Sequence, residues 1–272
     1  MLAVKKFDAR TLRKTVLDMA YAGSTVHIGC AFSIIELLAV LYRNHLRYPN
    51  DDCNDVARDY LVLSKGHGVM AQYACLRELG WLDQKAIDNY FADGTDLKGL
   101  SDSRVAGLEV TSGSLGHGFS VGVGLALGAK LSNTQQKTYV LVGDGEINEG
   151  PIWEAALFAA HHELHQLMLI VDENGFQAMG ATDEILRLNS IEDKLRSFGF
   201  DTQAVDGHDE LEIDQAITKL FSLKSLKPKA LIAKTVKGKG VPFMENNNIW
   251  HYTRLNEATY AQALEAVNAG SL

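Results

Sequence analysis

Residues 139–176 read YVLVGDGEINEGPIWEAALFAAHHELHQLMLIVDENGF and decide the fold. Two short apolar runs, 139–142 and 167–171, each end in polar residues, and the composition between them favours a helix over 152–164. This order predicts a strand, a crossover helix and a second strand parallel to the first. Ligands of open α/β sheets bind at the carboxyl ends of the strands. We therefore expect the polar groups that follow the two strands to lie together.

The residues at these strand ends suit a divalent cation bound together with a phosphate group. Asp144 offers carboxylate oxygens and Asn174 an amide oxygen, and Mg²⁺ takes such ligands beside phosphate oxygens and water. Gly143 and Gly145 carry no side chain, so an anion can approach the backbone, and the first N–H groups of the following helix favour negative charge. Gly-Asp-Gly alone more often marks an ordinary turn, but the placement of Asn174 favours a Mg²⁺–diphosphate site.

Gly-Asp-Gly followed by Asn174 resembles the thiamine-diphosphate motif, and residues 143–167 resemble its transketolase version. The resemblance covers about residues 8–268, which is less than half of a full transketolase. It implies one diphosphate-binding domain over residues 1–272. The implied fold class is α/β, a parallel sheet with helices on both faces, and the alternation of strands and helices indicates the same. The implied cofactors are thiamine diphosphate and Mg²⁺ or Ca²⁺, with Asp144, Asn174 and the main-chain carbonyl of Phe176 as metal ligands.

Three histidines map onto histidines of the family and are the implied catalytic residues. His27 lies in a segment similar to Ser-x-His-Pro-Gly, with Ile28 in place of the proline, and would face the thiazolium ring and the substrate. His67, in the segment SKGHG at 64–68, and His251 resemble histidines that reach the cofactor diphosphate. Without the resemblance, a lone loop histidine is more often a surface residue, and the turn at 64–68 is as often merely solvated.

The resemblance implies further cofactor contacts for the loop around Gly113 and Leu115, whose backbone would wrap the thiazolium and pyrimidine rings. The flanking glycines of the Asp motif, Gly143 and Gly145, would bind the cofactor too. Glu149 resembles a glutamate at the family's dimer interface, although an acid at a helix N-terminus is equally well explained by the helix dipole. Leu100 stands where the family usually has a substrate-contacting histidine, which puts the usual sugar-phosphate donors in doubt.

Two features of the helices remain open. Glycines interrupt the helix expected over 119–131, and each costs up to roughly 1 kcal/mol against alanine. Such a helix requires a very close neighbour, either another subunit or the sheet. His161 and His165 would share one helical face, but no His-Glu-x-x-His is present, so a helix end is favoured over a zinc site.

Composition excludes several classes of protein. The net charge of −8 argues against a nucleic-acid or anionic-membrane surface. No apolar stretch approaches the length of a membrane span, and the first residues lack the apolar core of a signal peptide. Cys30, Cys53 and Cys75 are scattered without a C-x-x-C, which indicates free thiols in a reducing cytoplasm.

These features lead to one hypothesis and two alternatives. The chain is expected to be the N-terminal subunit of a split transketolase, in which a C-terminal subunit supplies the pyrimidine-binding domain and the activating glutamate, in an α₂β₂ assembly. Together they would transfer a two-carbon ketol or related acyl unit from a ketose-type donor to an aldehyde acceptor. The alternatives are a two-component enzyme that takes pyruvate or another 2-oxo acid, and a non-catalytic cofactor-binding subunit.

Overall fold

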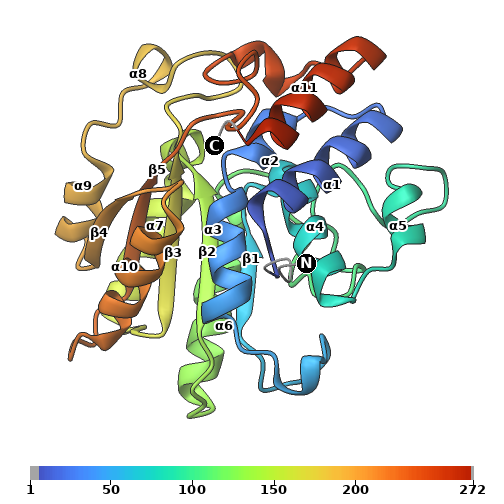
Figure 1. Cartoon of the computed structure of the whole chain (residues 1–272). Coiled ribbons are helices and arrows are strands. Elements are labelled where there is room, and N and C mark those ends of the chain that lie inside the picture. The colour runs from blue at the N-terminus through green and yellow to red at the C-terminus, as the bar shows by residue number, and fades with distance from the viewer. Residues whose placement is uncertain (1–5, 271–272) are drawn as a thin grey trace.

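The computed structural model describes residues 6–270, which form a five-stranded parallel sheet in the order β1-β2-β3-β5-β4 (Figure 1). The strands are β1 (Tyr60–Leu63), β2 (Thr138–Gly143), β3 (Leu167–Glu173), β4 (Asp201–Asp206) and β5 (Lys229–Lys234). The predicted fold class is confirmed. The single domain expected over 1–272 includes residues 1–5 and 271–272, which lie outside the described residues.

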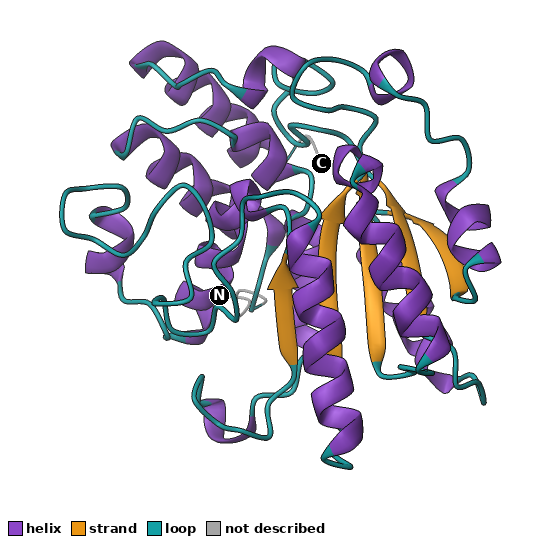
Figure 2. Cartoon of the chain, turned by 180° about the vertical axis from the view of Figure 1, so that it is seen from behind, coloured by secondary structure: helices purple, strands orange, loops and turns teal. Residues whose placement is uncertain are grey.

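The central strands are buried on both faces because their side chains alternate between two cores. Tyr139 and Leu141 of β2 enter the first core, whereas Val140 and Val142 enter the second. This two-sided burial explains the nearly continuous apolar runs in the sequence. The helices over the first core are α1 (Ala9–Ala22), α3 (Ile35–Val40), α4 (Val69–Leu79) and α10 (Glu210–Ser222); those over the second are α6 (His117–Leu131), α7 (Gly150–His161) and α9 (Ile191–Ser197). Figure 2 shows this second face, with helices lying across the strands.

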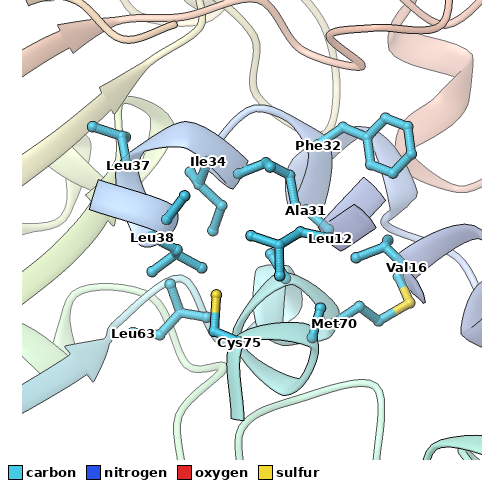
Figure 3. Packing of buried hydrophobic residues seen from close by; sticks show 14 of the residues in the cluster. Leu12, Val16, Ala31, Phe32, Ile34, Leu37, Leu38, Leu63, Met70 and Cys75 are labelled. Carbon is cyan, nitrogen blue, oxygen red and sulfur yellow. The ribbon is translucent and has the colours of Figure 1, made fainter. Parts of the chain in front are cut away.

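The first core holds α2, the short helix that begins directly after His27. Figure 3 shows side chains from α1, α3, α4, β1 and α2 (Ile28–Phe32) in contact around Leu38 and Met70. Every residue of α2 is buried. Since α2 follows His27 directly, this packing places His27 at the carboxyl end of the sheet.

The last helix, α11 (Glu257–Ala269), packs against α1 and brings the C-terminal segment beside it (Figure 1). It begins with a capping box formed by Asn256 and Thr259. The hydroxyl of Tyr260 donates a hydrogen bond to Asp18 over 2.7 Å, and its ring stacks on Tyr21. This contact holds the short helix η5 (Asn248–His251), which precedes α11, near α2.

The glycine-rich helix α6 meets the sheet on one side only. A Cβ added at Gly122 would lie 2.2 Å from Cγ2 of Val140, and one at Gly118 would lie 2.7 Å from Cα of Ser64. Gly124 and Gly128 face open space among the described residues. The expected close neighbour is therefore the sheet for Gly118 and Gly122. Exposed apolar side chains accompany the open glycines on this outer surface: Val121, Leu131, Leu157 and Phe158.

Some element boundaries differ from those that the sequence pattern predicts, which include a helix from about Ser33 to His45 and a strand from Phe198 to Val205. The range expected as one helix over 33–45 forms α3 and then a π-helical turn, η1 (Leu41–His45). The separate helix α2 ends just before this range, and the hydroxyl of Ser33, between α2 and α3, donates a hydrogen bond to Asp172. The strand expected over 198–205 begins only at Asp201, because the left-handed backbone of Gly199 makes a turn before it. Two short helices, α5 (Gln84–Asp88) and α8 (Thr182–Ile185), complete the α-helical elements of the described chain. No described helix is long and apolar enough to cross a membrane.

Candidate functional site

A cavity of about 480 Å³ lies at the carboxyl ends of β1, β2 and β3. Every residue that the sequence resemblance assigned to catalysis, cofactor or metal lines it: His27, His67, Gly113, Leu115, Gly143, Asp144, Gly145, Glu149, Asn174, Phe176 and His251. The structure therefore brings all of these residues together. It adds residues outside the predicted set: Cys30, Lys65, Glu146, Asn148, Gln177, Ala178, Met179 and Tyr252.

Asp144 joins the ends of β2 and β3. Its Oδ1 accepts a hydrogen bond from the N–H of Gly145, and its Oδ2 accepts from the N–H of Gly175, each over 2.7 Å. The hydroxyl of Thr182 adds a bond of 3.2 Å to Oδ2. Burial, followed by the nearby Asp172 carboxylate, raises the pKa of Asp144 to about 7. A cation beside this carboxyl would offset the unfavourable buried charge.

The amide of Asn174 is oriented by its neighbours. Its Nδ2 donates to Oδ2 of Asp172 over 2.8 Å, and its Oδ1 accepts from the N–H of Phe176 over 3.1 Å. Because Asp172 takes the amide nitrogen, the carbonyl oxygen with its second lone pair remains for another partner. Outer-shell contacts of this kind fix the orientation of metal ligands.

A buried ion pair lies beneath these groups. The Lys65 ammonium contacts the carboxylate of Asp172, and both side chains are at most 2 % exposed. Ser33 donates to the same carboxylate over 2.8 Å, and Thr235 also donates to it. Burial raises the pKa of Asp172, but the Lys65 ammonium outweighs this effect and the pKa lies below its ordinary value. Lys65 thus joins the end of β1 to the end of β3.

The three predicted histidines form one cluster. The ring of His27 lies 5.3 Å from that of His67 and 5.2 Å from that of His251, and His67 and His251 lie 5.6 Å apart. His27 adopts a left-handed backbone, φ +70°, and its N–H donates to the carbonyl of His251 over 2.9 Å. Burial lowers the pKa of all three imidazoles, that of His251 to about 3, so they are neutral at pH 7.

Lys237 is a second ammonium at the cavity. Its Nζ lies 2.9 Å from Nδ1 of His251 and 2.7 Å from Oδ1 of Asn248. Burial is the largest cause that lowers the pKa of Lys237. The sequence placed Lys237 only at the end of a predicted strand, and the fold shows that this lysine is buried.

Glu146 links three segments around the cavity and is 1 % exposed. Its Oε1 accepts from the hydroxyl of Ser64 over 2.5 Å and from the N–H of Gly116 over 2.9 Å. Its Oε2 accepts from the N–H of Gly143 over 3.3 Å. This carboxylate therefore fixes the glycine-rich loop against the ends of β1 and β2. An acid one residue after Gly-Asp-Gly was visible in the sequence, but its burial was not.

The donor set fits a divalent cation and a diphosphate. Asp144 and Asn174 offer oxygen atoms for a hard cation. Two side-chain amide nitrogens at the cavity, Nδ2 of Asn148 and Nε2 of Gln177, are buried without a hydrogen-bond partner in the part of the chain that the structure describes. Buried N–H donors are rarely left unpaired. An anion in the cavity would pair them, together with the two ammonium groups.

Two further expectations concern side chains near α7. Glu149 is exposed and precedes the helix as its N-cap residue, without a side-chain capping bond. The helix ends at His161, so His165 lies beyond it. The helix therefore ends before the expected position 164, and the two histidines do not share a helical face, which agrees with a helix end at this place rather than a zinc site.

Comparison with known proteins identifies a family. The family "Transketolase, thiamine diphosphate binding domain" matches residues 4–268. The chain is 38 % identical over 256 residues to one of the subunits of the apulose-4-phosphate transketolase of Phocaeicola vulgatus, covering 94 % of this chain and 91 % of that protein. It is 38 % identical over 258 residues to "6-deoxy-6-sulfo-D-fructose transketolase subunit SqwG" of a Clostridium species, covering 94 % of each. The transketolase structure from Campylobacter jejuni superposes with a TM-score of 0.87 at 29 % identity, covering 96 % of this chain but 42 % of that one.

Proposed function

The chain belongs to the transketolase family, and we propose that it is one subunit of a split, thiamine-diphosphate-dependent transketolase. The two-chain enzyme transfers a two-carbon ketol or related acyl unit from a ketose-type donor to an aldehyde acceptor. The observation that carries this proposal is the joined strand ends, with Asp144 bonded to Gly175 beside Asn174. The chain spans nearly the whole of the two subunits named above but only 42 % of the C. jejuni transketolase.

The cavity residues divide into two groups in this proposal. Asp144, Asn174 and the carbonyl of Phe176 hold Mg²⁺ or Ca²⁺. The diphosphate lies against His67, His251, Gly143 and Gly145, while Gly113, Leu115 and Glu149 surround the rest of the cofactor. The oxygen ligands beside buried N–H donors support this division.

Thiamine diphosphate, when bound, supplies the carbanion that adds to a ketone and stabilises the charge left after C–C cleavage. The chain's own contribution is to bind, orient and exchange protons. Neutral His27 and His67 can accept or donate a proton at a substrate oxygen, and His251 keeps His27 in place through its main-chain carbonyl. The left-handed backbone of His27 supports a positioned functional side chain.

The proposed partner is a C-terminal transketolase subunit that carries the pyrimidine-binding domain, in an α₂β₂ assembly. Exposed apolar side chains at and near the cavity mouth support a covering protein surface: Leu100, Met179, Ile249 and Tyr252 are all more than two-fifths exposed. The open glycine face of α6 offers a second contact surface. The three free cysteines support a cytoplasmic location.

The side chain of Leu100 bears on which donor substrate the enzyme takes. Leu100 packs over Gly113, so the cavity wall at this point is apolar. This favours, as a second candidate, an enzyme that takes pyruvate or another 2-oxo acid. A non-catalytic cofactor-binding subunit is the third.

A donor screen with the chain and its partner separates these candidates. The proposal predicts transfer of two carbons from a ketose phosphate to an aldehyde. Mass spectrometry of the products measures this transfer. Release of CO₂ from a 2-oxo acid without ketose turnover favours the second candidate. Cofactor binding without turnover of any donor favours the third. Leu100→His is the informative variant, and the proposal predicts that it shifts the ranking of donors toward ketose phosphates.

A further inference from the structure

Three side chains of types that bind metals, from distant parts of the chain, converge in the cavity. They are a different set from Asp144 and Asn174. They are Cys30 on α2, His67 on the turn η3 (Gly66–Gly68) and His251 on η5, and one ligand atom of each lies within 4.8 Å of the others. Sγ of Cys30 and Nδ1 of His251 are 3.6 Å apart. In a tetrahedral zinc site, bonds of about 2.3 Å to sulfur and about 2.0 Å to nitrogen place ligand atoms about 3.5 Å apart. The Cys30–His251 pair already has this spacing.

We propose that Cys30, His67 and His251 form a site for a soft divalent cation of the Zn²⁺ class, which binds the cofactor-free chain and excludes the cofactor diphosphate. Metal binding does not depend on the proposed function, whereas its competition with thiamine diphosphate rests on it. The ligand atom of His67, within 4.8 Å of the other two, reaches tetrahedral spacing through a shift of at most about 1.5 Å.

The protonation states of the ligands suit such an ion. Both imidazoles are neutral, since burial lowers the pKa of His67 and His251, and their lone pairs are available. Burial raises the pKa of Cys30, so the thiol holds its proton until a metal binds. As the sulfur–metal bond forms, that proton leaves to solvent.

The cavity would bind two classes of cation at two different sets of ligands. Asp144 and Asn174 present oxygen ligands, which Mg²⁺ prefers. Cys30, His67 and His251 present sulfur and nitrogen, which Zn²⁺ and Co²⁺ prefer. Excess Mg²⁺ should therefore leave the soft ion in place.

Neighbouring charges decide how tightly the ion binds. The Lys65 ammonium is neutralised by its contact with Asp172. Lys237 directly opposes the ion, because its Nζ donates to Nδ1 of His251 over 2.9 Å and so occupies a ligand lone pair. It retains Asn248 as a partner when it leaves the histidine. Removing Lys237 should therefore strengthen cation binding and weaken binding of an anion such as diphosphate.

The test is titration of Co²⁺ alone into the cofactor-free full chain, in the presence of excess Mg²⁺, followed by the thiolate-to-cobalt absorption band. The inference predicts a band that saturates at one ion per chain and disappears in Cys30→Ser. Cys53→Ser, which alters a cysteine that does not line this cavity, keeps the band. Lys237→Met lowers the dissociation constant about tenfold. If the wild type shows no band, or if the band remains in Cys30→Ser, the proposed metal site is contradicted.

Two further measurements keep the inference separate from the proposed function. His251→Gln, checked for native circular dichroism, should also weaken Co²⁺ binding more than about tenfold, and unchanged binding contradicts the assigned ligands. Thiamine diphosphate with Mg²⁺ should bleach the cobalt band, whereas simultaneous binding of both overturns the exclusion. A chain that binds Co²⁺ but never thiamine diphosphate refutes the proposed function and leaves the metal site standing.

Discussion

The backbone N–H of Gly175 donates a hydrogen bond to Oδ2 of Asp144 over 2.7 Å and joins the loops that follow β2 and β3. Through this bond the carboxylate that follows β2 and the amide of Asn174 are held at one edge of the sheet. The fold thus brings two separate sequence motifs together as one set of oxygen atoms, which fits a divalent cation.

Asp144 should give the cofactor-free chain a distinctive pH dependence. Its folded pKa of about 7 lies above the ordinary value of 3.8, so the folded state holds an extra proton between these pH values. By linkage, its contribution to stability is complete below about pH 4 and is lost as pH rises through about 7, by roughly 1.4 kcal/mol per pH unit at most. Denaturant unfolding from pH 4 to 8 measures this loss as the difference in free energy of unfolding between the wild type and Asp144→Asn. The buried histidines have the opposite effect on stability, but both proteins contain them, so their effect cancels in the difference.

The same carboxyl sets the pH dependence of metal binding. Mg²⁺ requires the ionised form, so Mg²⁺-dependent affinity for thiamine diphosphate should rise with pH until about 7 and then level off. Titration calorimetry across this range measures it. An affinity that is flat between pH 5.5 and 8, or equal in Asp144→Asn, would contradict the assigned ligand.

Removing only one partner of the Lys65–Asp172 ion pair should strongly lower the free energy of unfolding. Both groups are buried, so Lys65→Met leaves an unpaired carboxylate and should lower the free energy of unfolding by about 3–5 kcal/mol. The double variant Lys65→Met/Asp172→Asn removes both charges and should be less destabilised than the sum of the singles. Arg196→Met breaks ion pairs with Glu192 and Asp193 at the surface and should cost at most about 1 kcal/mol. Strict additivity in the double variant would argue against the pair.

Two glycines of α6 should respond to alanine in opposite directions. At Gly122 a Cβ would meet Val140 at 2.2 Å, so Gly122→Ala should destabilise the chain by about 1–3 kcal/mol. At Gly124 nothing lies within 4 Å, so Gly124→Ala should stabilise the isolated chain by up to about 1 kcal/mol. If the open face contacts another subunit, Gly124→Ala also weakens the assembly, which sedimentation measures. Equal effects of the two changes would show that α6 is placed wrongly.

Glu146→Gln tests the buried carboxylate that links the loops. A glutamine offers one acceptor oxygen in place of two, so at least one of the bonds from Ser64, Gly116 and Gly143 is lost. We expect a loss of about 1–3 kcal/mol in stability and weaker cofactor binding. Glu149→Gln, three residues away and exposed, is the matched control and should change stability by less than about 0.5 kcal/mol. Similar melting temperatures for the two variants would refute the linking role.

Local pattern was sufficient for most of the fold. The apolar patterns predict a strand over 60–63 and a helix over about 69–79, which are the bounds of β1 and α4, because each element has an apolar pattern bounded by turn residues. The boundaries that failed depend on contacts that periodicity does not report. For example, α2 and α3 are separated at Ser33 and Ile34, and the Ser33 hydroxyl bonds there to Asp172, 139 positions away.

The site was predictable only where a motif is contiguous. Asp144 and Asn174 follow apolar strands, and their convergence followed from sheet topology alone. The sequence left the turn at Lys65 open between an anion-binding and a solvated one and assigned no role to Lys237, yet each lysine is 1 % exposed. Their burial results from partners far along the chain, such as Asp172 for Lys65, 107 positions away. Similarly, Cys30 is significant only because His251 folds against it.

The central claim is that this chain is the metal- and diphosphate-binding half of a two-chain thiamine-diphosphate enzyme. Its most direct test is deuterium exchange at C2 of thiamine diphosphate with Mg²⁺, followed by NMR for this chain by itself, its partner by itself and their mixture. Exchange that is fast only in the mixture is the predicted result, since the activating acid then comes from the partner. Fast exchange by this chain alone, or none in the mixture, would contradict the claim.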